Sequence, residues 1–166
     1  MRVKDAIALL KQDHKNVKQL LKRLEGKNAG QREELLTEIE NEVKVHTAIE
    51  EEIFYPAFKE SLRSKSDVHL YFEAMEEHHV VDMVMPEIKN ADADSEEFAA
   101  KVKVLKDLIE HHAEEEEKQM FPKARKSMGT SRLREVGEEL HERKEELKTS
   151  MWGRAVGAIT GRRRVA

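Results

Sequence analysis

The stretches HTAIEEEIFYP (residues 46–56) and HAEEEEKQMFP (residues 112–122) carry the same pattern at two places in the chain. In each, a histidine is followed four and five residues later by two glutamates, and ten residues later by a proline. Residues four apart lie on the same face of an α-helix, so the histidine and the first of these glutamates can point at one place. The repeat therefore indicates two related helices, each presenting an imidazole and a carboxylate.

The rest of the chain is also typical of helices. Hydrophobic and charged residues each make up 39% of the sequence, and the apolar residues recur at helical spacing nearly throughout. No useful length alternates with period two, so we expect an all-α fold: an up-down-up-down four-helix bundle with a short C-terminal fifth helix. Pro56 should bend the second helix or end its regular part. The expected helices span about 3–24, 32–62, 68–89, 96–126 and 132–149.

We expect three parts along the chain: the bundle in residues 1–128, a helical extension in residues 129–150, and a basic tail in residues 151–166. The tail contains no acidic residue and has four arginines among small residues. This composition is typical of a segment without fixed structure.

The composition also limits the classes of protein. The chain has no cysteine, so any metal must be held by histidine and carboxylate. No stretch approaches the roughly 20 apolar residues that a membrane span needs, and the N-terminus does not resemble a secretory signal, so we expect a cytoplasmic protein. The net charge of −4 argues against nucleic acid as a partner. Separately, we expect the protein to be a monomer or a weak dimer.

Each of the two repeated stretches can be matched with one histidine on the helix before it. The same apolar offsets of +3, +6, +7 and +10 follow His14 and His78, so a whole helix pair is repeated. The His-x-x-x-Glu spacing alone occurs at five places in this glutamate-rich chain and is weak evidence by itself. Measured along antiparallel helices, the repeated residues fall close to one level of the bundle. The predicted layer contains His14, His46, Glu50, His78, His112 and Glu116.

Such a layer is hard to explain by packing. Six buried polar or ionisable groups without partners would each cost roughly several kcal/mol. Two metal ions bridged by the two carboxylates, with two imidazoles each, would satisfy all six groups. Imidazole with carboxylate suits iron or manganese, and also zinc.

These motifs, together with Asp13-His14 and Glu77-His78, resemble the hemerythrin-like (HHE cation-binding) family, in its bacterial single-domain form, over about residues 5–125. The resemblance implies a non-haem di-iron centre, two iron ions with an oxo or hydroxo bridge, inside the bundle. The ligands that it implies are the six residues of the predicted layer. It further implies a small gaseous or peroxide ligand, namely O₂, peroxide or NO.

One position departs from the pattern of the oxygen-carrying members, which have an extra histidine one turn before the third-helix histidine. Ala74 stands there in this chain and cannot bind a metal. Tyr71 lies within about 20° of His78 around the helix, and we consider it as a metal ligand or as a group beside the ligands. A core tyrosine bonded elsewhere is the alternative. An open or phenolate-bound iron would favour peroxide or redox chemistry over O₂ carriage.

Other functions stay open at this point. The protein could have peroxide-consuming, catalase-like activity, or it could be an iron or oxygen sensor or an iron-storage protein without turnover. A ferritin-like site needs Glu-x-x-His pairs, which occur at Glu76/His79 and Glu138/His141. Glu51 and Glu117 are expected mostly as surface charges, with hydrogen bonds to the ligand histidines as the alternative.

Overall fold

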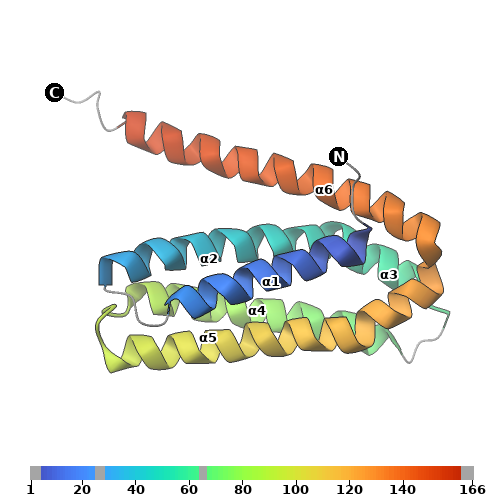
Figure 1. The fold of residues 1–166 in the computed structure, drawn as a ribbon, viewed down its shortest axis with the longest axis horizontal. Helices are drawn as coiled ribbons and strands as arrows, with labels where there is room; N and C mark the ends of the chain where they lie inside the picture. The colour runs from blue at the N-terminus through green and yellow to red at the C-terminus, as the bar shows by residue number, and fades with distance from the viewer. Residues whose placement is uncertain (1–4, 25–28, 64–66, 162–166) are drawn as a thin grey trace.

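The computed structural model describes residues 5–24, 29–63 and 67–161. Its core is formed by the helices α1 (Ala6–Leu24), α2 (Ala29–Ile49), α4 (Val68–Asn90) and α5 (Glu96–Glu115). These four helices run alternately up and down and lie side by side (Figure 1). The all-α bundle predicted from the sequence is confirmed.

Two π-helical turns interrupt the long helices where the repeated stretches lie. After α2 come η1 (Glu50–Phe54) and α3 (Tyr55–Ser61), and after α5 comes η3 (Glu116–Met120). In η1 the N–H of Tyr55 donates to the carbonyl of Glu50, five residues back, and η3 ends with the same arrangement. A proline lies two residues after the end of each turn, lacks an N–H and crowds the carbonyl four residues earlier. The wider π turn relieves this crowding, so the chain continues as helix beyond each proline instead of ending there.

The last helix, α6 (Phe121–Gly161), contains a sharp kink at Gly129, with φ of 73° and ψ of 171°. This backbone conformation is almost restricted to glycine. Beyond the kink, α6 runs back along the outside of the bundle next to α1 and α2 (Figure 1). The break predicted near residues 127–131 is therefore present at Gly129, where two helical segments of α6 meet.

The ends of the predicted helices also differ from the structure. The sequence predicted a tail without fixed structure from residue 151, whereas α6 continues to Gly161. Residues 162–166 of that tail lie outside the described residues. The boundaries of the three predicted parts, at 128 and 150, stay predictions. None of the helices in the described part of the chain combines the length and the apolar content needed to cross a membrane.

The apolar core consists of two clusters separated by a polar layer. One cluster lies around Phe54, Phe58 and Phe121, and the other lies around Leu21, Ile39 and Leu105. Between the two clusters lies a layer of buried polar side chains, which on α1 are those of Asp13 and His14. The fold thus encloses this polar layer between two apolar cores.

Candidate metal centre

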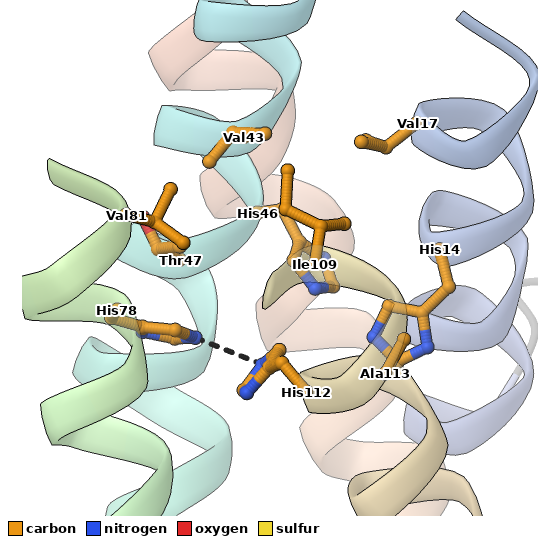
Figure 2. A pocket seen from close by; sticks show the side chains of 10 residues that line it. All are labelled: His14, Val17, Val43, His46, Thr47, His78, Val81, Ile109, His112 and Ala113. Carbon is orange, nitrogen blue, oxygen red and sulfur yellow. Dashed lines mark hydrogen bonds between the residues drawn. The ribbon is translucent and has the colours of Figure 1, made fainter. Parts of the chain in front are cut away.

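The polar layer gathers the buried polar side chains of the described residues at one place. One histidine comes from each of α1, α2, α4 and α5, and Figure 2 shows the four imidazoles converging. The carboxylates come from the first residue of each π turn and from α1. All are at most 7% exposed; they are Asp13, His14, His46, Glu50, His78, His112 and Glu116. The structure therefore brings together all six residues of the predicted layer.

Glu50 lies between two pairs of histidines. Its Oε1 is 3.2 Å from His46 Nε2 and 4.0 Å from His14 Nε2. Its Oε2 is 3.4 Å from His78 Nε2 and 4.0 Å from His112 Nε2. One carboxylate thus offers a separate oxygen to each pair.

Glu116 lies across the same gap. Its Oε2 is 3.1 Å from His14 Nε2 and 3.6 Å from His112 Nε2. Atoms that share one ion at about 2.1 Å lie roughly 3.0–3.4 Å apart at octahedral or tetrahedral angles. The observed separations between the inward nitrogens and the carboxylate oxygens are close to this range.

The opposite nitrogen of each histidine, Nδ1, faces a further carboxylate. Three of these pairs are within hydrogen-bonding distance, so the Nδ1–H donates to the carboxylate and fixes the ring. Glu51, in the first π turn, pairs with His78 of the second half of the repeat, and Glu117, in the second π turn, pairs with His14 of the first half. The pairs are His14 with Glu117 at 3.0 Å, His78 with Glu51 at 2.8 Å, His112 with Glu77 at 2.7 Å, and His46 with Asp13 at 3.7 Å.

The carboxylates that face the Nδ1 atoms determine the tautomer of each histidine, and thus whether its Nε2 presents a lone pair to the centre. A neutral imidazole that donates from Nδ1 has a lone pair on Nε2. His78 Nε2 and His112 Nε2 are only 3.1 Å apart, a contact drawn in Figure 2. In addition, His14 Nε2, Glu50 Oε1 and both oxygens of Glu116 are buried without a hydrogen-bond partner. Acceptor atoms that face one another in a dry site need a cation or protons between them, so the donor set fits metal ions.

The pKa shifts within the cluster indicate that it binds protons when no metal is present. Burial and the charge of Glu116 raise the pKa of Glu50 well above its usual range. Burial lowers the pKa of His46 to about 4, whereas for His14 and His112 the effect of burial is outweighed by Glu116, which raises their pKa values. Metal uptake would therefore displace protons, and it should weaken as the pH falls.

The phenol beside the centre belongs to Tyr55 and not to Tyr71. The Tyr55 O–H donates to Glu50 Oε2 at 3.4 Å, and its oxygen is 3.2 Å from His78 Nε2. Burial, together with the charges of Glu116 and Glu50, raises the pKa of Tyr55 well above its usual value, so the phenol keeps its proton. The Tyr71 ring packs edge-on against Tyr55, with the centroids 6.2 Å apart.

A small apolar chamber adjoins the imidazoles on the side away from the π turns. Its volume is about 30 Å³, enough for a diatomic molecule or a peroxide. Figure 2 shows the side chains one turn above the histidines, and they are mainly aliphatic. The chamber is lined by the four histidines with Val17, Val43, Thr47, Val81, Ile109 and Ala113.

The ferritin-like alternative is not supported by the positions of its residues. Both Glu-x-x-His pairs are exposed, and the second pair lies on α6, outside the bundle. The four residues concerned are Glu76, His79, Glu138 and His141.

Comparison with known proteins agrees with this geometry. The family model of the hemerythrin HHE cation binding domain matches residues 5–124. A crystal structure of a hemerythrin HHE cation binding domain-containing protein from Mycobacterium kansasii superposes with a TM-score of 0.77, at 25% sequence identity and covering 89% of each chain. A DNA nickase from Nostoc sp. is 25% identical over 159 residues; the match covers 95% of this chain, but the chain spans only 43% of that protein's length.

Proposed function

Because the chain belongs to the hemerythrin HHE cation-binding family, we propose that its buried layer holds two non-haem iron ions and reacts with a small oxygen ligand. One ion would be held by His14 and His46, and the other by His78 and His112. Glu50 and Glu116 would bridge the two ions. The division of the Glu50 oxygens between the two histidine pairs is the observation that supports this proposal most strongly.

We further propose that the preferred ligand is hydrogen peroxide. When bound, the two iron ions supply the redox couples for disproportionation, in which two molecules of peroxide yield one O₂ and two waters, so no outside reductant is consumed. The chain contributes the chamber, which has room for a single small molecule, and the protonated phenol of Tyr55. Such a chamber is too small for a mineral store, which argues against iron storage.

Metal content and peroxide turnover test this proposal together. Protein loaded with Fe(II) without oxygen and then desalted should retain two irons per chain and should release O₂ from hydrogen peroxide. Retention of two irons without O₂ release would leave reversible ligand binding or sensing as the function. Circular dichroism after chelation then identifies a sensor, because a protein that signals through metal-dependent folding would lose helix.

Replacing Tyr55 by phenylalanine should lower the rate of peroxide turnover about 100-fold, as expected for the loss of a positioned proton donor. The iron content should stay at two per chain, because the hydroxyl is not among the proposed ligands. Tyr71→Phe is the matched control, since that ring packs against Tyr55 and lies under Lys59. A larger loss in Tyr71→Phe than in Tyr55→Phe would reverse the assignment, and loss of a phenolate absorption band in that variant would restore Tyr71 as a ligand.

The similarity to a DNA nickase bears on the prediction that nucleic acid is not a partner. The groove between α1 and α5 is lined by several lysines, but also by Glu110 and Glu117, and Lys11 pairs with Glu117 at 3.6 Å. The five lysines of this groove outnumber its two glutamates, so the prediction rests on the net charge of −4 of the whole chain and not on the groove. Duplex DNA at low salt should therefore show no gel shift with the protein; a shift that disappears with added salt would contradict the prediction.

A further inference from the structure

One of the four histidines is held differently from the others. The Nδ1 atoms of His14, His78 and His112 are 2.7–3.0 Å from their carboxylates, whereas His46 Nδ1 is 3.7 Å from Asp13 Oδ2. This separation exceeds a hydrogen bond, and neither atom has another hydrogen-bond partner. Asp13 Oδ2 is the carboxylate oxygen that faces His46 Nδ1, so a small movement of the Asp13 carboxylate decides whether the two atoms form a hydrogen bond.

The position of Asp13 depends in turn on α6. Its Oδ1 forms a short ion pair with the Nζ of Lys144, on the part of α6 that runs back along the bundle. Both side chains are largely buried, with 6% of Asp13 and 13% of Lys144 exposed. The carboxylates of Glu51, Glu77 and Glu117, which hold the other histidines, are between 20% and 37% exposed and lie on bundle elements. A buried charge pair is sensitive to the loss of either member, so Lys144 constrains Asp13 strongly.

Two further ion pairs hold the same part of α6 without reaching the centre. Arg143 donates two hydrogen bonds to Glu52, at 2.7 and 3.3 Å, and Lys148 donates to both oxygens of Glu42, at 2.8 and 3.1 Å. Lys148 lies one turn beyond Lys144 and is 33% exposed. It is thus a matched lysine that docks α6 but does not touch Asp13.

We propose that Lys144 is a positioning residue that couples the docking of α6 to metal binding at His46. Lys144 holds Asp13, Asp13 orients His46, and the ion on the His14/His46 side is bound more tightly while α6 is docked. The proposal rests on the proposed two-iron centre. Coupling between two sites is reciprocal, so metal binding should also hold α6 more firmly against α1 and α2.

Metal affinity of the iron-loaded full chain tests the forward direction. In competition with a chelator, Lys144→Met should lose one of its two irons at about tenfold lower chelator concentration than wild type, because groups that orient a ligand contribute about 10- to 100-fold to metal affinity. The second iron should be retained as in wild type. Lys148→Met leaves the Lys144–Asp13 and Arg143–Glu52 pairs in place, so it should release its irons at a chelator concentration much closer to that of the wild type than Lys144→Met does. In an Asp13→Asn background, Lys144→Met should have no further effect if Lys144 acts through Asp13.

Hydrogen exchange of the wild type tests the reciprocal direction and needs no variant that must fold. Iron should slow amide exchange in residues 140–151, and Lys144→Met should abolish this protection. Equal exchange with and without iron, or equal iron release from Lys144→Met and Lys148→Met, would overturn the coupling. A wild-type protein that does not hold two irons would instead refute the proposed function.

Discussion

Replacement of Glu50 by alanine is expected to abolish binding of both irons. Glu50 is fully buried, and its two oxygens face different histidine pairs, so its removal takes one ligand from each ion. Loss of a group that only orients a metal ligand already weakens binding about 10- to 100-fold, and loss of a shared ligand should weaken both sites by more than about 100-fold. Metal analysis after desalting is the measurement.

Two further variants show whether this loss comes from the ligand and not from misfolding. Glu50→Gln keeps the side-chain volume but removes the anionic oxygen, so it should also lose both irons. Its metal-free form should melt no lower than the wild type, because burial already favours the neutral form of Glu50 and the amide is neutral too. Glu60→Ala is a change at an exposed position on α3 and should keep both irons. Retention of two irons by Glu50→Gln would show that Glu50 is not a bridge.

Replacement of Phe121 by alanine is expected to give a large loss of stability. Phe121 is 1% exposed, stacks on the His14 ring at 5.9 Å, and meets Phe54 edge-on at 5.5 Å. Truncation of a buried phenylalanine costs about 3–5 kcal/mol, and in a chain of this size that should lower the melting temperature by roughly 10 °C. Thermal and urea unfolding of the metal-free protein measure the effect without a contribution from iron.

Phe72→Ala is the control for this experiment, because that side chain is 56% exposed on α4. A substitution at such a position should change stability by no more than about 0.5 kcal/mol. If Phe121→Ala and Phe72→Ala behaved alike, the apolar cluster beneath His14 would not be a closely packed core.

The sequence was sufficient to predict the bundle and the residues that meet at its centre. The reason is the repeat, because a histidine four residues before a glutamate occupies one helix face whatever the rest of the fold is. Two copies separated by apolar helices had to face each other, and His14 and His78 followed by alignment. The structure places these side chains together, and their role as metal ligands is the proposal tested by Glu50→Ala.

The sequence could not identify the correct phenol, because a π turn is not visible in helical periodicity. On a regular α-helix, the Tyr55 side chain would lie about 140° away from that of Glu50 around the helix axis. In η1 the hydrogen bond from Tyr55 reaches back five residues to Glu50, and the widened turn brings the two side chains together. Pro56, immediately after Tyr55, was the available signal.

The contribution of α6 was also beyond prediction from a single sequence. The Lys144–Asp13 contact joins residues far apart in the chain, and it depends on the reversal of direction at Gly129. Local patterns predict helices, but they do not specify against which face a helix packs. Asp13 was recognised only as part of a motif, and its position between Lys144 and His46 required the three-dimensional structure.

The crossed pairing of the two halves has a consequence for protein synthesis. His14 emerges early from the ribosome, but Glu117, the group that orients it, follows about a hundred residues later. A nascent chain that ends before η3 lacks Glu116, the second of the two proposed bridging carboxylates. At most three of its four imidazoles can then face the carboxylates that they face in the folded protein. Iron can therefore be captured in its final geometry only after translation has passed Glu117, so the metal must be delivered after all four helices of the bundle have been synthesised.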